Sequence, residues 1–119
     1  MSITVTSRIL SRTVIVDVSG RLSFLEISLS EHVNESLAEG HLDFVLNLAD
    51  VPYVDSFGLG QLITVWTSIR SKDGRLVLLR PTDHVRQLLE ISKLNTVFPI
   101  SDDEAQAVAS VQRNYAVPA

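Results

Sequence analysis

Hydrophobic and polar residues alternate in the first part of the chain. Residues 3–9 place apolar side chains mostly at every second position, which is typical of a half-buried β-strand. Residues 13–18 (TVIVDV) are rich in β-branched side chains and are followed by Gly20, which indicates a second strand. Only a short polar connection around Ser11 and Arg12 separates the two segments, so they predict an antiparallel hairpin.

Further along, short apolar runs alternate with segments of helical periodicity. The runs at residues 44–48 and 75–79 are nearly continuous, which predicts strands covered on both faces. A run at residues 96–100 predicts a last strand, and its proline indicates an edge position. Between these runs, apolar residues three and four positions apart predict four helices. Their apolar stripes are Leu29, Val33 and Leu37; Leu59, Leu62, Ile63, Trp66 and Ile69; Val85, Leu88 and Leu89; and Ala105, Val108 and Ala109.

Hydroxyl side chains mark the expected starts of three helices. Ser28 and Ser101 are each followed three residues later by a glutamate, which is the capping-box pattern. Thr82 precedes the third helix and is placed to cap it. Strands and helices thus alternate along the chain, and this order predicts an α/β fold with a mixed β-sheet flanked by about four α-helices.

Length and composition narrow the class of protein. The 119 residues predict one domain over residues 1–119, with a core over about residues 3–112 and a flexible tail at residues 113–119. The net charge of −4 and the scattered lysines and arginines argue against binding to nucleic acid. The absence of cysteine excludes disulfides and thiolate chemistry. No signal peptide or membrane-spanning run is visible, so we expect a cytoplasmic protein without a membrane partner.

Candidate chemistry gathers where the strand at residues 44–48 has ended and the next helix begins. Ser56 lies at this corner, within VPYVDSFGLGQ, and a helix start offers unpaired N–H groups and the positive end of the helix dipole. A phosphoryl group on Ser56 would be held there and would bring roughly −1.5 to −2 charges beside Asp55. Gly58 and Gly60 would let another backbone approach closely. The corner therefore predicts an electrostatic switch that breaks a docking interface.

A second interpretation of Ser56 is purely structural. Serine is among the commonest helix N-caps, and an Asp-Ser pair before an apolar helix is ordinary capping. The residues alone leave this interpretation beside the switch, because strand–turn–helix corners of open sheets are also where binding sites gather.

Catalytic chemistry finds little support in the sequence. A nucleophile elbow requires Gly-x-Ser-x-Gly, and Val54 stands at its first glycine. A dinucleotide fingerprint requires a third glycine, where Ile63 stands. A small hydrolase using Ser56 would need a histidine within hydrogen-bond reach. The three histidines are far apart in sequence and are expected on the solvated surface: His32, His41 and His84. We therefore predict no enzymatic activity, no cofactor, no metal and no small-molecule substrate.

Several stretches of the chain together form a specific pattern. The strongest is VLNLADVPYVDSFGLGQL, and the Gly20 turn, DGRLVLLRP and VRQLLEISKLNTVFPI support it. These stretches resemble the STAS domain family, and specifically its small stand-alone anti-sigma-factor antagonists of bacteria. The first is similar to the family's hydrophobic strand followed by Asp-Ser-(Ser/Thr/Ala)-Gly-Leu-Gly, and Lys93 in the last replaces a family glycine. The resemblance covers about residues 3–112.

This resemblance implies a mixed sheet flanked by helices and a role in partner switching. Family members bind an anti-sigma factor that is a serine-protein kinase, which displaces the sigma factor. The kinase then phosphorylates the serine after the motif's aspartate, the antagonist releases, and a PP2C-type phosphatase resets it. Carried onto this sequence, Ser56 is the phosphoacceptor, and the partner-binding surface includes Asp55, Gly58, Leu59 and Gly60. We expect a monomer or a weak dimer.

Two departures from the family pattern add partner-binding candidates. Phe57 stands where the family has a small residue, and we expect an exposed anchor, with an inward-folded ring as the alternative. Arg21 and Ser23 stand where the family commonly has two acids. Arg21 would favour an acidic partner patch or a phosphoryl group. The alternative function is a constitutive STAS interaction or scaffold module in which Ser56 is only a helix cap.

Overall fold

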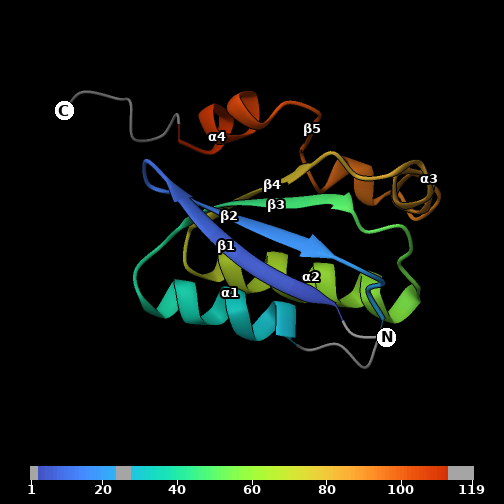
Figure 1. Ribbon diagram of the computed structural model, residues 1–119, viewed down its shortest axis with the longest axis horizontal. Helices are drawn as coiled ribbons and strands as arrows, with labels where there is room; N and C mark the ends of the chain where they lie inside the picture. The colour runs from blue at the N-terminus through green and yellow to red at the C-terminus, as the bar shows by residue number, and fades with distance from the viewer. Residues whose placement is uncertain (1–2, 24–27, 113–119) are drawn as a thin grey trace.

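The computed structural model describes residues 3–23 and 28–112 and arranges them as a five-stranded β-sheet with helices on both faces (Figure 1). The elements in chain order are β1 (Thr4–Leu10), β2 (Thr13–Ser19), α1 (Ser28–Ala38), β3 (Asp43–Asp50), α2 (Ser56–Ser71), β4 (Arg75–Leu79), α3 (Asp83–Ile91), the 3-10 helix η1 (Leu94–Thr96), β5 (Ile100–Ser101) and α4 (Glu104–Gln112). The strands lie in the order β1-β2-β3-β4-β5; β1 is antiparallel to β2, and the other neighbours are parallel. In the described part of the chain, the predicted mixed sheet with four α-helices is confirmed. The predicted tail at residues 113–119 lies outside the described residues.

The predicted hairpin at the amino terminus is also confirmed. β1 pairs with β2 along its whole length. β2 lies inside the sheet and is mostly buried, whereas β1 forms one edge and is mostly exposed. Arg8 of β1 ties this edge to α4, because its guanidinium donates to Asp17 at 2.7 Å and to Glu104 at 2.8 Å.

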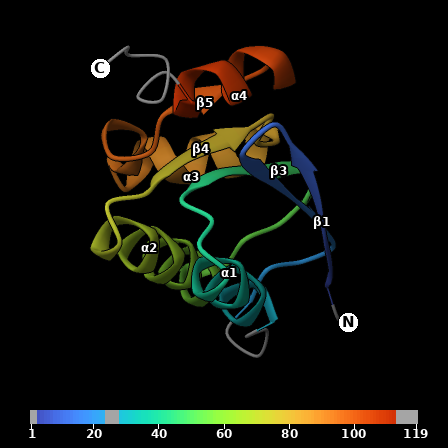
Figure 2. The same ribbon diagram turned by 90° about the vertical axis from the view of Figure 1, so that its left-hand side faces the viewer.

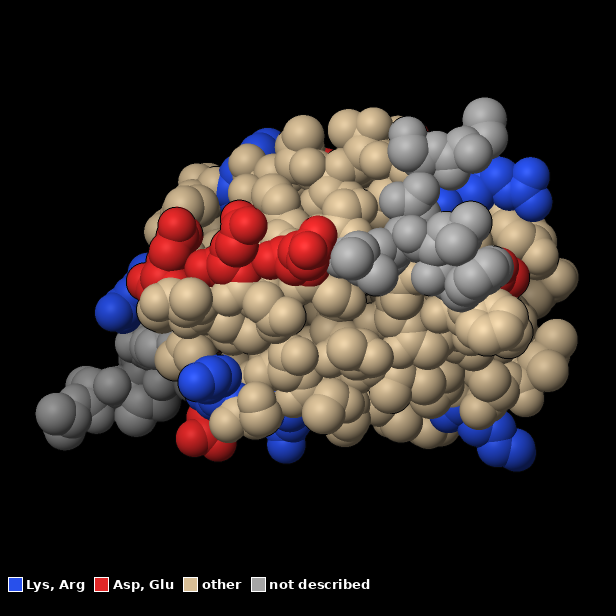
Figure 3. Space-filling model, turned by 90° about the horizontal axis from the view of Figure 1, so that it is seen from below, with Lys and Arg blue, Asp and Glu red and all other residues tan. Residues whose placement is uncertain are grey.

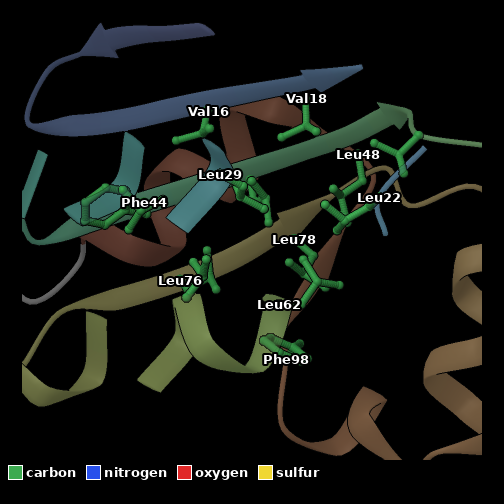
Figure 4. Close-up of a cluster of buried hydrophobic side chains, with 14 of the residues drawn as sticks. Val16, Val18, Leu22, Leu29, Phe44, Leu48, Leu62, Leu76, Leu78 and Phe98 are labelled. Carbon is green, nitrogen blue, oxygen red and sulfur yellow. The ribbon is translucent and has the colours of Figure 1, made fainter. Parts of the chain in front are cut away.

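Two hydrophobic clusters pack on opposite faces of the sheet. α1 and α2 cover one face and α4 covers the other (Figures 1 and 2). Figure 4 shows the larger cluster, where strand residues such as Phe44 and Leu78 lie with Leu29 of α1 and Leu62 of α2. The smaller cluster consists of Ile15, Val45, Val77, Leu79, Ala107, Val108 and Val111. Cover on both faces explains why the apolar runs of β3 and β4 are nearly continuous.

The last strand is shorter than the sequence predicted. Residues 94–96 form η1, and β5 pairs with β4 at only two positions. The N–H of Phe98 donates to the carbonyl of Leu94 at 2.9 Å, so the chain is still turning where a strand was expected. The Phe98 side chain is buried and meets the ring of Trp66 edge-on. The apolar run at residues 96–100 therefore includes a core residue, Phe98, outside any strand. The prediction of a strand at residues 96–100 was wrong over most of its length.

The start and the buried face of α4 also differ from the prediction. Asp103 caps the helix, since its Oδ2 accepts from the N–H of Gln106 at 2.9 Å. Ser101, the predicted cap, accepts from the N–H of Asp103 in the turn before the helix. The second capping-box residue, Glu104, is engaged by Arg8. The buried residues of α4 are Ala107, Val108 and Val111, whereas Ala105 and Ala109 are exposed.

Two other predicted caps have different roles in the structure. Ser28 is the first residue of α1 and so lies one position inside the helix instead of capping it. Thr82 does occupy the N-cap position of α3, but its hydroxyl donates to the carbonyl of Val51 at 3.0 Å. Thr82 therefore ties α3 to the segment that follows β3.

The predicted apolar stripe of α2 is confirmed in part. Leu62 and Ile69 are fully buried, and Trp66 is half-buried at the border of the larger cluster. Ile63 is 39% exposed, and Val65 takes its place in the core. α2 thus presents an outer face that carries some apolar side chains.

Candidate functional site

The loop after β2 and the segment after β3 lie side by side at the carboxyl ends of these two parallel strands. The N–H of Leu22 donates to the carbonyl of Tyr53 at 3.0 Å, and the N–H of Asp55 donates to the carbonyl of Leu22 at 3.3 Å. This pairing places the loop with Arg21 and Ser23 directly beside the start of α2. The topology therefore joins two groups of candidates that lie about 30 residues apart in the sequence.

Asp55, and not Ser56, caps α2. The Asp55 backbone is extended, and its Oδ1 accepts from the N–H of Gly58 at 2.7 Å. Ser56 is the first residue of the helix and is exposed. Its hydroxyl makes no hydrogen bond within the described residues. The capping interpretation of Ser56 was therefore wrong, and the hydroxyl is accessible beside the positive end of the helix dipole.

The two glycines of this turn differ in what they permit. A Cβ on Gly58 would lie 2.2 Å from the carbonyl oxygen of Leu22, so only glycine fits against the neighbouring loop. A Cβ on Gly60 would meet nothing within 4 Å. The predicted close approach of a second backbone is confirmed at Gly58 and is wrong at Gly60. Among the described residues, the outer face of α2 therefore has no side chain and no neighbouring atom at Gly60.

Leu59 and Ser23 hold this corner together. Leu59 is half-buried against the larger cluster, and its N–H donates to the carbonyl of Asp55 at 2.8 Å. The backbone carbonyl of Ser23 accepts from the side-chain amide of Gln61 on α2. Both residues thus fix the loop and the helix relative to each other.

The outer face of α2 next to Ser56 carries no charged side chain, although Asp55 and Arg21 lie at its edge. Phe57 is 61% exposed, so the inward-folded alternative for its ring was wrong. Residues 56–69 of α2 contain no charged side chain. Figure 3 shows this side of the molecule, where a broad area without charges borders a row of acidic side chains. In α1, Glu31 and Glu35 are exposed, as is Glu39 directly after the helix, and the three are spaced by four residues. An exposed aromatic on such a surface is typical of a protein-binding site.

Three side chains from two loops and the start of α3 stack beside this surface. The Arg21 guanidinium lies 4.6 Å from the centroid of the Tyr53 ring, and the Tyr53 ring stacks on the His84 ring at 5.2 Å with an interplanar angle of 17°. His84 is exposed as predicted, but its stacking with Tyr53 was not foreseen from the sequence. Only the topology could have linked these residues, because it brings the segments after β2, β3 and β4 to one end of the sheet.

The groups with perturbed pKa values lie outside this corner. The Arg8 guanidinium, with help from Asn47, lowers the pKa of Asp17 below its ordinary value despite partial burial. Burial raises the pKa of Asp43 at the start of β3, against the opposing charges of Arg75 and Arg12.

A hydrolytic centre at Ser56 lacks its general base. None of the three histidines makes a hydrogen bond to the Ser56 hydroxyl, and His84 is stacked on Tyr53. Over residues 3–23 and 28–112 no group of three or more metal-ligating side chains is present. In the same ranges no helix has both the length and the hydrophobicity to span a bilayer.

Comparison with known proteins places these features in a family. A Thermotoga maritima protein provisionally named an anti-sigma factor antagonist is 32% identical over 80 residues, covering 67% of this chain and 71% of the relative. The anti-sigma-B factor antagonist of Staphylococcus aureus is 28% identical over 88 residues, covering 73% and 82%. A crystal structure of a Thermotoga maritima protein with the same provisional name superposes with a TM-score of 0.83 at 28% identity, covering 92% and 95%.

The match extends over nearly the whole described fold. The family model for the STAS domain matches residues 3–107, which begin at the entry to β1 and end within α4. The resemblance found in the sequence is therefore confirmed, and the chain belongs to the STAS domain family.

Proposed function

We propose that this protein is an anti-sigma factor antagonist whose binding is switched by phosphorylation of Ser56. The observation that carries the proposal is that Asp55 and Ser56, adjacent at the start of α2, have different roles. Asp55 satisfies the cap, so the exposed Ser56 hydroxyl has no hydrogen-bonding role within the described residues. The names of the relatives in Thermotoga maritima and Staphylococcus aureus support the same role.

The partner in this proposal is an anti-sigma factor that is also a serine-protein kinase, in the cytoplasm. The unmodified protein, a monomer or a weak dimer, binds the kinase through the face that bears Ser56. Phe57 and Arg21 contact the partner directly, because both are exposed. The remaining members of the binding surface shape the corner or leave it accessible: Ser23, Asp55, Gly58, Leu59 and Gly60. A PP2C-type phosphatase removes the phosphoryl group and restores binding.

The switch follows from the charge that phosphorylation adds. The kinase transfers the γ-phosphoryl group of its ATP to the Ser56 oxygen; the hydroxyl proton leaves and ADP is released. The product carries about −1.5 to −2 charges beside the Asp55 carboxylate, at the start of a helix whose residues 56–69 carry no charge. Docking would then require burying that charge against an apolar partner surface, which costs more than the contacts return. The complex therefore dissociates.

Calorimetric titration with the kinase encoded in the same genome tests this proposal. We expect Ser56→Asp to weaken binding at least about tenfold, since a fixed charge stands in for the phosphoryl group. We expect Ser56→Ala to bind like the wild type but to remain bound when ATP is added. Ser71→Asp, at the exposed far end of α2, is the matched control and should bind normally. Equal binding by all variants, with no release by ATP, would favour the constitutive scaffold module instead.

A further inference from the structure

The sheet edge formed by β4 is only half covered. β5 pairs with β4 at Leu78 and Leu79 and with no earlier residue of that strand. The N–H of Leu78 donates to the carbonyl of Pro99, and the N–H of Arg80 donates to the carbonyl of Ser101. Before Pro99 the chain turns away into η1, so within the described residues the first half of β4 pairs with β3 on one side and has no strand on its outer side.

Backbone alternation shows which groups are left open on this edge. Successive residues of a strand direct their N–H and C=O groups to opposite neighbours. Leu78 bonds toward β5 and Arg75 donates to Leu42 on the other side, so Leu76 points toward the uncovered side. Within the described residues, the N–H of Leu76 has no acceptor there. A strand-shaped ligand would find one donor and one acceptor in register.

A groove of about 460 Å³ lies along this open edge, and we call it the edge groove. Leu76 and Val77 line it from β4, Trp66 and Arg70 from α2, and Val97 and Val111 from the segment before β5 and from α4. α2 and α4 lie on opposite sides of β4, which gives the groove two walls (Figure 2). The groove thus runs along the uncovered part of β4 between α2 and α4, far along α2 from Ser56.

The charges of the edge groove have one sign. Arg70 and Arg75 are both among the residues that line it, and none of the described lining residues is acidic. The guanidinium of Arg70 lies 6.0 Å from the centroid of the Trp66 ring, which holds it over the groove. A ligand that suits this lining has carboxylates for the arginines and apolar side chains for the walls.

We propose that the edge groove is a second binding site, which takes an extended, acidic segment of a partner protein as an added strand beside β4. The backbone of the segment pairs with Leu76, and its side chains alternate between the two walls, so that its carboxylates meet Arg70 on the α2 side and its apolar side chains lie against Val111 on the α4 side. Strand addition of this kind takes affinity from main-chain hydrogen bonds and specificity from alternating side chains. The proposal does not depend on Ser56 or on its phosphorylation.

The experiment uses the full chain and a synthetic probe, the capped peptide acetyl-Val-Glu-Val-Glu-Val-amide. Trp66 is the only tryptophan of the chain and lines the groove, so its fluorescence reports occupancy directly. We expect a saturable change with a dissociation constant of about 0.1 mM, and among backbone amide signals in NMR we expect Leu76 to shift most. The corresponding lysine peptide should bind at least about tenfold more weakly.

Matched variants separate this site from its surroundings. Arg70→Gln should weaken binding of the glutamate peptide at least about fivefold, since it removes one of the two cations of the groove. Lys72→Gln removes an exposed cation that does not line the groove and should leave binding unchanged. Ser56→Asp should also leave it unchanged, so failure of the phosphorylation switch and failure of this site are distinguishable.

Several outcomes would overturn the proposal. The absence of a saturable fluorescence change up to about 5 mM peptide would do so, as would equal binding of the lysine peptide. Amide shifts centred on Phe57 instead of Leu76 would assign the peptide to the other face. A Trp66 signal that depends on protein concentration without peptide would assign the groove to a second copy of this chain. Shifts confined to residues 113–119 would assign it to the chain's own segment.

Discussion

α2 and α4 both begin at an aspartate cap with a serine close by, yet the two helix starts use their polar groups differently. At α4, Ser101 both donates to the carbonyl of Asp103 and accepts from its N–H. Glu104 is held by Arg8, so the side chains of Ser101, Asp103 and Glu104 all have partners in the fold. At α2, Asp55 satisfies the cap alone and the Ser56 hydroxyl remains exposed. A serine at a helix start is thus structural or available for modification according to which neighbour does the capping.

The starts of α2 and α4 also differ in the kind of contact that attaches them to the rest of the fold. α4 is held by side chains, through the Arg8 ion pairs with Asp17 and Glu104. The start of α2 is held by backbone, because Gly58 lies against the carbonyl of Leu22. Backbone packing leaves the Ser56 hydroxyl without a hydrogen bond in the described residues, which suits a group that must be reached by an enzyme.

The largest effect is expected from filling the backbone contact at the start of α2. Gly58→Ala places a Cβ 2.2 Å from the Leu22 oxygen, so the loop or the helix must move. We expect a loss of about 2–4 kcal/mol in the free energy of unfolding, measured by urea denaturation. Gly60→Ala is the matched control, and since its Cβ meets nothing, we expect a gain of about 0.5–1 kcal/mol. Equal effects of the two substitutions would contradict the close packing at Gly58.

The sequence predicted the architecture well because the spacing of apolar residues along the chain reflects which face of each strand or helix is buried. The continuous runs of β3 and β4, the hairpin, and the motif around Ser56 were all found from local patterns. Local patterns could not distinguish Asp55 from Ser56 as the cap, because adjacent residues both have capping side chains. The strand predicted at residues 96–100 was wrong for a related reason. A buried aromatic residue such as Phe98 gives the same apolar pattern whether it lies in a strand or in a turn. The stack on Tyr53 and the edge groove depend on contacts between distant segments, and no local pattern contains them.

An intermediate effect is expected from acid, which acts on the side-chain contacts of α4 and spares the backbone contact of α2. The pKa of Asp17 is lowered in the folded protein, first by the hydrogen bond from Arg8. Its contribution to stability is therefore complete above the ordinary pKa of 3.8 and is lost as the pH falls through the lower folded value. We expect Asp17→Asn to be less stable than the wild type at pH 7 and to lose less stability on acidification.

Urea midpoints measured at pH values from neutral to strongly acidic give this comparison. Glu90→Gln removes an exposed carboxylate without an ion pair in the described structure and should follow the wild-type curve. Parallel curves for wild type and Asp17→Asn would show that Arg8 does not stabilise the α4 end through this carboxylate.

The smallest effect is expected from the pair of serines with which the comparison began. Ser101→Ala removes a hydroxyl with two hydrogen bonds, and we expect a loss of about 0.5–1.5 kcal/mol in unfolding free energy. Ser56→Ala removes an exposed hydroxyl without a hydrogen bond in the described residues, and we expect a change within about 0.5 kcal/mol. A loss at Ser56 as large as that at Ser101 would mean that its hydroxyl is needed for the fold. The near-neutral result would instead leave Ser56 without a role in stability, as expected for a residue whose use lies in its modification.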